Sequence, residues 1–274
     1  MKQAINDICD RFDCDYLGKM KVYLGCKIDY NKKDGSIEMT QPVMLQSFED
    51  EFKINKNKRR ITPAESGSVL APAEERNFVG PRQQKYYRSG VGKFLHGARW
   101  SRPEIQNAVR ELSRSMKGAA KPHIDAMHHV MEYCVQTKNR GWTLKPNRKW
   151  DGKSKDFEFI INGKADGDFA KCPVISKSVS GYSTFLEGVP ITAKSTMQKF
   201  VALSVTESES SAGTSCARDM LYIIRLLEYM GLKVQKPMIL ERDNKGAVDL
   251  ADNWSAGGRT KHVKLTFLRD LQQK

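Results

Sequence analysis

The sequence lacks the features that define several large classes of protein. It contains no run of about 18 apolar residues, the minimum for a membrane-spanning helix, so we expect no membrane partner. No apolar stretch of the signal-peptide type opens the chain, and we therefore expect an intracellular site, in a cytoplasmic particle or the nucleus. None of the six cysteines forms a CxxC pair, and the five histidines complete no set of ligands, which argues against a zinc site or a disulfide framework.

What the sequence does contain is typical of a folded protein with a basic surface. Its 274 residues are 39% hydrophobic and 28% charged, enough for one large domain or two ordinary ones. Residues 1–150 carry 28 Lys and Arg against 17 Asp and Glu, a net charge of +11, whereas 151–274 carry 18 against 15, a net charge of +3. Phosphate contacts release condensed counterions, so this excess favours a nucleic-acid partner.

The densest group of basic residues lies early in the chain. It consists of Lys53, Lys56, Lys58, Arg59 and Arg60. We consider this run a candidate nucleic-acid contact. A solvated surface loop is the ordinary alternative, and the run on its own does not decide between them.

Residues 1–146 show a mixture of helix and strand patterns, so we expect an α+β arrangement there. Apolar residues at 5, 8 and 12 predict a short helix. Asp34-Gly35 predicts a hairpin between strands at 22–30 and 36–40, because glycine supplies the positive φ of the turn. The other expected elements are helices from residue 42, from residue 101 and over 122–135, and an irregular linker over 53–81.

A polar break over 147–154 predicts a domain boundary, which gives domains of 1–146 and 155–274. After the break the pattern changes to alternating apolar residues. The expected elements are strands at 157–161, 178–186 and 190–194, a long helix, a strand at 238–240 and a last helix. This order is typical of the α/β class.

Two aspartates follow predicted strands. We expect Asp166 just past the first strand of the second domain and Asp243 just past the fourth. If these strands are neighbours, their ends place both carboxylates in one crevice, where ligand sites form in open α/β sheets.

A third acid comes from the start of the long helix. Thr206 and Glu209 have the spacing of a capping box, which predicts that the helix begins there. Small residues follow Glu209 at the i+3, i+4 and i+7 positions, whereas polar residues follow Glu207 at the same offsets. We therefore expect Glu209, rather than Glu207, to point inward.

Three clustered carboxylates repel one another and require a cation. Magnesium, with manganese as the alternative, prefers such oxygen ligands, and Asp166, Glu209 and Asp243 are the candidate ligands and catalytic residues. One or two such ions would activate water against a phosphodiester. The ordinary alternative, a helix cap and two loop residues, stays open on spacing alone.

Several motifs occur in a fixed order along the chain. In the second half they are Lys177–Ser183, Val201–Glu209, Asp243-Asn244 and Arg259–Val263, and in the first half Tyr16–Gly25, Tyr87–Gly92 and Ser101–Ile105. The first set resembles the ribonuclease H region of copia-type retrotransposon polyproteins. The second set is similar to the part of their reverse transcriptase that follows the polymerase active site. The resemblance covers nearly the whole chain.

The resemblance implies a ribonuclease H-like mixed sheet flanked by helices in 155–274, cleaving the RNA strand of RNA–DNA hybrids with magnesium. Asp166, Glu209 and Asp243 match the acidic positions of the family, and Asp168 and Glu207 are neighbouring acids that it also tends to carry. Residues 1–146 would then be a reverse-transcriptase remnant, thumb-like or connecting, that grips the hybrid. The polymerase part of the polyprotein is a further expected partner.

Two departures from the family pattern bear on activity. The chain has no Tyr-x-Asp-Asp motif, so we expect no DNA synthesis from it alone. Lys264 follows Val263 where the family usually has an aspartate, which would put a positive charge beside the metal ligands. Three hypotheses follow: an active hybrid nuclease, a catalytically inactive relic that at most binds nucleic acid, and a general basic nucleic-acid binder unrelated to retroelements.

Overall fold

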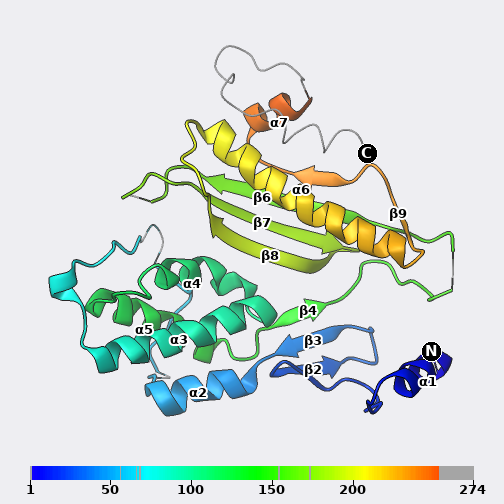
Figure 1. The fold of residues 1–274 in the computed structure, drawn as a ribbon, viewed down its shortest axis with the longest axis horizontal. Helices are drawn as coiled ribbons and strands as arrows, with labels where there is room; N and C mark the ends of the chain where they lie inside the picture. Colours follow the sequence, from blue (N-terminus) through cyan, green and yellow to red (C-terminus); the bar gives the residue numbers. More distant parts are fainter. Residues whose placement is uncertain are drawn as a thin grey trace.

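The computed structural model describes residues 2–252, except 56, 66, 68, 154 and 173. Two sheets with their own helices are stacked one above the other, the first half of the chain below and the second half above (Figure 1). The described residues form two hydrophobic cores, one in each half. The chain is therefore a mixed α/β protein, and the division at 1–146 and 155–274 stays a prediction.

A four-stranded antiparallel sheet opens the first half. Its strands are β1 (Val22–Tyr23), β2 (Cys26–Tyr30), β3 (Ile37–Thr40) and β4 (Trp142–Leu144), in that spatial order, and the helix α1 (Lys2–Arg11) precedes them. The hairpin predicted at Asp34-Gly35 joins β2 and β3, with Gly35 at φ 76° and the Asp34 carboxylate accepting hydrogen bonds from Ser36. The single strand expected over 22–30 was wrong, because positive φ at Leu24 and Gly25 turns the chain between β1 and β2.

Helices supply the core of the first half. They are α2 (Pro42–Phe52), α3 (Pro81–Trp100), α4 (Gln106–Ser113) and α5 (Lys121–Gln136), with the short 3-10 turns η1 (Glu75–Asn77) and η2 (Pro103–Ile105). The sequence analysis missed α3, since glycines at 90, 92 and 97 disfavour a helix. Tertiary packing explains two of them. A Cβ at Gly90 would lie 2.4 Å from Met127 Sδ, and one at Gly97 would lie 2.7 Å from Met44 Cε.

The second half contains a mixed sheet covered by a long helix. The strands are β6 (Ile161–Asp168), β7 (Val179–Leu186), β8 (Val189–Met197) and β10 (Ile239–Glu241), in the spatial order β10-β6-β7-β8. β10 is parallel to β6, and the other neighbours are antiparallel. The tight turn expected at Glu187-Gly188 joins β7 and β8. The strand expected over 157–161 is interrupted at Ile160, so that β5 (Glu158–Phe159) pairs instead with β9 (Lys233–Val234).

The helix α6 (Val205–Tyr229) crosses one face of this sheet, and the short helix α7 (Lys245–Asp252) follows β10 (Figure 1). Close approach of α6 to β6 requires glycine at 163, where a Cβ would lie 2.5 Å from Cys216 Sγ. Within the described ranges, no helix is both long and apolar enough to cross a membrane.

The two halves touch through α4. The side-chain amide of Gln106 donates to the Ala193 carbonyl of β8 at 2.5 Å, and the Arg114 guanidinium donates to Cys172 Sγ at 3.0 Å. The residues of the predicted boundary are also held. Arg148 makes two hydrogen bonds, of 2.8 and 2.6 Å, to the carboxylate of Glu187 in the β7–β8 turn. The helices of the first half therefore lie beside the sheet of the second.

Candidate metal centre

Asp166 and Asp243 come from neighbouring parallel strands. Asp166 lies within β6, so its expected place just past the strand was wrong by two residues, since β6 continues to Asp168. The register pairs Lys164 of β6 with Glu241 of β10. Asp243 lies two residues beyond Glu241 and Asp166 two residues beyond Lys164, so the two aspartates lie side by side. The adjacency on which the shared crevice depended is confirmed.

Glu209 lies in the first turns of α6, but the predicted cap was wrong. The N-cap is Ser204, whose hydroxyl accepts from the Glu207 backbone N–H at 3.1 Å. Glu207 Oε2 in turn accepts from the Leu203 N–H at 2.7 Å. The cap is therefore formed by Ser204 and Glu207, two residues earlier than the predicted pair Thr206 and Glu209. This frees the Glu209 carboxylate, which is buried as expected, at 4% exposure.

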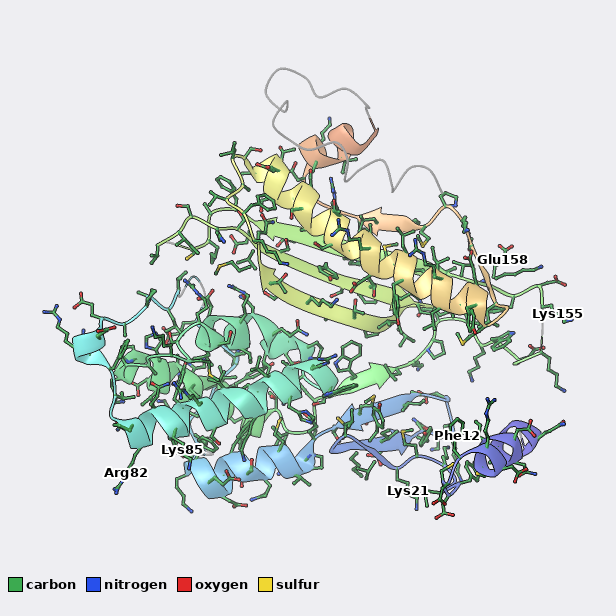
Figure 2. All side chains as sticks on the ribbon, viewed as in Figure 1. Phe12, Lys21, Arg82, Lys85, Lys155 and Glu158 are labelled. Atoms are coloured by element: carbon green, nitrogen blue, oxygen red, sulfur yellow. The ribbon has the colours of Figure 1, made fainter. Side chains whose placement is uncertain are left out.

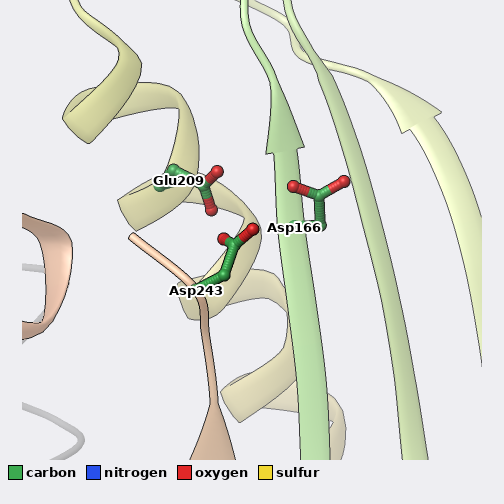
Figure 3. Close-up of side chains that lie close together, drawn as sticks. All are labelled: Asp166, Glu209 and Asp243. Carbon is green, nitrogen blue, oxygen red and sulfur yellow. The ribbon is translucent and has the colours of Figure 1, made fainter. Parts of the chain in front are cut away.

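The three carboxylates meet at one point. An oxygen from each of Asp166, Glu209 and Asp243 lies within 4.8 Å of the others (Figure 3). Asp166 and Asp243 are exposed, whereas Glu209, on α6, is buried. Segments more than 70 residues apart in the sequence thus contribute to a single acidic cluster, which consists of these three residues.

The electrostatics of this acidic cluster favour a cation. Burial raises the pKa of Glu209, and the charges of Asp166 and Asp243 raise it further, against the Gly167 N–H and Arg242, which lower it. Glu209 Oε2 is buried and has no hydrogen-bond partner among the described residues. A buried carboxylate oxygen without a donor is costly. An oxygen-preferring divalent ion would satisfy it, so the residues present fit magnesium or manganese.

The acidic cluster opens into a cavity of about 580 Å³ between the two halves of the chain. Asp166, Asp243, Lys164 and Lys194 line it from the second half. The first half contributes Pro103 and Glu104 of η2, which belong to the motif Ser101–Ile105, and two residues at the start of α4 that the sequence analysis did not single out, Gln106 and Asn107. No local pattern could have identified them, because their place in the wall depends on how α4 packs against β8.

Arg242 is a second feature that the sequence analysis did not single out. Its guanidinium packs over Gly213 of α6, where a Cβ would lie 2.3 Å from Nη1. Burial lowers the pKa of Arg242, and the charge of Glu209 opposes that shift. A cation therefore already stands near the buried member of the acidic cluster.

The acids adjacent to the cluster have other partners. Asp168 pairs with Lys171 at 3.1 Å, and Glu207 is engaged in the cap of α6. These two acids therefore contribute to local structure outside the acidic cluster.

Comparison with known proteins gives several Pol polyproteins of transposons among the relatives. The chain is 28% identical over 270 residues, 95% of its length, to the retrovirus-related Pol polyprotein from transposon TNT 1-94 of Nicotiana tabacum. It is 30% and 29% identical over 181 residues, 66% of its length, to the Pol polyproteins from transposons RE1 and RE2 of Arabidopsis thaliana. These three homologues are Pol polyproteins of copia-type transposons.

The chain covers only a small part of these relatives, 19% of the first and 12% of each of the others. No family model matches it, and no solved structure matches it significantly. The resemblance inferred from the motifs is thus confirmed at the level of the Pol polyprotein. The ribonuclease H-like fold and the nuclease activity stay predictions.

The basic run lies beside α5. Lys58 and Arg60 form ion pairs with Glu132 at 3.7 and 2.8 Å, and the Arg60 N–H donates to Gln136. Lys53 and Arg59 are exposed, and Lys56 lies outside the described residues. A nucleic-acid role for the run stays a prediction. Lys264 and the motif Arg259–Val263 also lie outside the described residues.

Proposed function

We propose that the chain is a fragment of a copia-type polyprotein whose residues 155–274 form a ribonuclease H-like domain that hydrolyses the RNA strand of RNA–DNA hybrids. The observation that carries the proposal is the convergence of Asp166, Glu209 and Asp243, with oxygens within 4.8 Å and a buried, unpartnered Glu209 Oε2. Residues 1–146 are then a reverse-transcriptase remnant that holds the hybrid. The polymerase part of the polyprotein is the second proposed partner.

The chemistry follows from the donor set. Asp166 and Asp243 present exposed oxygens to the cavity, and Glu209 closes the cluster from the helix side. A divalent cation held by these oxygens supplies water activation and neutralises the charge that develops on the phosphodiester. The protein orients the scissile phosphate between the cluster and the opposite wall of the cavity, formed by Gln106 and Asn107.

The surroundings suit a nucleic acid. Gln106, Asn107, Lys164 and Lys194 line the cavity, and side chains of these types bind phosphate and ribose oxygens. Exposed basic side chains, among them Arg82 and Lys85, project from α3 into solvent (Figure 2). A hybrid would be recognised by groove shape and ribose 2′-hydroxyls, which agrees with a wall of amides.

The test is cleavage of a labelled RNA–DNA hybrid by the full chain with magnesium or manganese. We expect cleavage by the wild type, and Asp166→Asn is expected to reduce the rate by about 100-fold or more, because it removes a ligand and a charge. Asp168→Asn is the matched control. It makes the same chemical change two residues along β6, at a side chain paired with Lys171, and should retain most of the activity. Equal activity of Asp166→Asn and the wild type would refute the assignment.

A second candidate is an inactive relic that binds hybrids without cutting them. The Arg242 guanidinium near the acidic cluster favours it, because a fixed positive charge opposes the binding of a cation. Hybrid binding measured by fluorescence anisotropy, with no cleavage under any magnesium or manganese condition, would establish the relic and reject the nuclease.

A further inference from the structure

Arg242 packs against α6 at Gly213, near the acidic cluster. Its guanidinium lies over Gly213, where an added Cβ would approach Nη1 to 2.3 Å and Cδ to 3.0 Å. Gly213 is one helical turn after Glu209, so the two positions share a face of α6. Arg242 is also the neighbour of Asp243 in the chain. The guanidinium therefore lies on the face of α6 that carries Glu209.

Two polar atoms of opposite charge are left without partners at this place. Glu209 Oε2 and Arg242 Nη2 are both buried, and neither has a hydrogen-bond partner among the described residues. Removal of either charge from water is costly, and the attraction of the other charge offsets that cost. Three carboxylates carry a charge of −3 when ionised, and the guanidinium reduces the total to −2.

We propose that Arg242 is the resident cation of the acidic cluster: it stabilises the metal-free carboxylates and, by the same charge, weakens the binding of divalent metal. This inference rests on the proposed function, since it assumes that Asp166, Glu209 and Asp243 take a divalent ion. Arg242 is a positioning residue for the site. Among the described residues, no hydrogen bond joins Arg242 Nη2 to the unpartnered Glu209 Oε2.

The physical basis is that one fixed charge acts in opposite directions on the two states. In the metal-free protein the guanidinium attracts Glu209 and lowers the repulsion among the three carboxylates. In the metal-bound protein it repels a divalent cation at the same site. Removal of the charge should therefore destabilise the first state and favour the second. A purely structural arginine would not produce this pair of effects, because loss of packing weakens the site and the fold together.

The experiment uses the full chain stripped of metal with a chelator, and Mn²⁺ alone as the probe. Isothermal titration calorimetry gives the dissociation constant, and thermal unfolding without metal gives the melting temperature. For Arg242→Gln we expect Mn²⁺ binding tighter by about tenfold or more, since a full charge within a partly buried site is removed, and a lower metal-free melting temperature. Arg225→Gln, the same change at an exposed residue of α6, should alter neither quantity.

A second variant guards against misfolding of Arg242→Gln. Gly213→Ala keeps the arginine but fills its place on α6, so the guanidinium must leave its present position. Alanine also has a higher helix propensity than glycine, so we expect this variant to fold. We expect Gly213→Ala to tighten Mn²⁺ binding in the same direction as Arg242→Gln.

The outcomes separate this inference from the proposed function. If the wild type binds Mn²⁺ and both variants bind it with equal or weaker affinity, the role of Arg242 is overturned and the metal site stands. Binding of Mn²⁺ by neither the wild type nor the variants would overturn both proposals. Tighter binding in both variants, with Asp166→Asn abolishing it, supports both.

Discussion

Gly167 of β6 lies directly against the backbone of Glu209 on α6: a Cβ at position 167 would stand 2.7 Å from the Glu209 nitrogen and 2.9 Å from its Cα. The residue next to Asp166 thus sets how closely the helix that carries Glu209 approaches the strand. Backbone atoms cannot move aside as a flexible side chain can, so only glycine permits this contact. The distance between Asp166 and Glu209 depends on a residue that contributes no side chain.

We predict that Gly167→Ala separates α6 from β6. The added methyl group would overpack a backbone contact, which costs about 1–3 kcal/mol in free energy of unfolding. The shift of the helix should also weaken Mn²⁺ binding, because Glu209 moves with it. Urea denaturation and calorimetry measure the two effects.

The control for this prediction is Gly92→Ala, the same change at an exposed position of α3 where no atom lies within 4 Å of the added Cβ. There alanine should stabilise the protein slightly through helix propensity. If Gly167→Ala proved as stable as the wild type with unchanged Mn²⁺ affinity, the contact would not determine the geometry of the site.

We predict that Ser204, rather than Thr206, caps α6. Ser204→Ala removes the hydroxyl that accepts from the Glu207 N–H. It should lower the free energy of unfolding by about 1 kcal/mol, as the loss of an N-cap usually does.

 Thr206→Ala, two residues later, is the comparison and should cost less than half as much. Chemical denaturation of both variants measures the difference, and a larger loss for Thr206→Ala would reassign the cap to the position that spacing alone suggested.

We predict a stability that depends on pH through Glu187. Burial alone would raise the pKa of Glu187, but hydrogen bonds from the Arg148 guanidinium and the Ile160 N–H outweigh it, and the pKa lies below its ordinary value. A carboxyl group whose pKa is lowered by folding stabilises the protein above its ordinary pKa of about 4.3, and this contribution disappears as the pH falls through the lowered value.

The measurement is the free energy of unfolding of the wild type and Glu187→Gln as a function of pH. The wild type should be the more stable of the two at pH 7, and the difference should shrink as the pH falls below about 4. Glu228→Gln is the control, since its pair with Lys236 is exposed and such pairs contribute little. A difference that stayed constant from neutral to acid pH would contradict the role of the Glu187 charge.

Local patterns were sufficient to predict much of the second half of the chain. Alternation and the Glu187-Gly188 turn predicted the β7–β8 hairpin, and the small residues after Glu209 predicted that this glutamate points inward. Both inferences depend on neighbours within one or two turns of the chain. The helix α3 was missed for the opposite reason, because its glycines are explained by Met44 and Met127, which belong to other helices.

The cap of α6 shows how local spacing can mislead. Two overlapping pairs, Ser204 with Glu207 and Thr206 with Glu209, satisfy the same pattern. The structure uses the first pair, Ser204 with Glu207. Glu209 packs against Gly167 instead and does not cap its own helix. A tertiary contact thus decided between two locally equivalent choices.

The sequence by itself determined the kinship with copia-type polyproteins, the identity of the three acids and most of the strands and helices, because each is encoded in the order and periodicity of nearby residues. Only the tertiary structure decided that β10 lies beside β6, that Arg242 occupies the gap over Gly213, and that Gln106 and Asn107 face the acidic cluster. These relationships join segments separated by dozens of residues, and packing and charge between such segments leave no periodic trace in the chain.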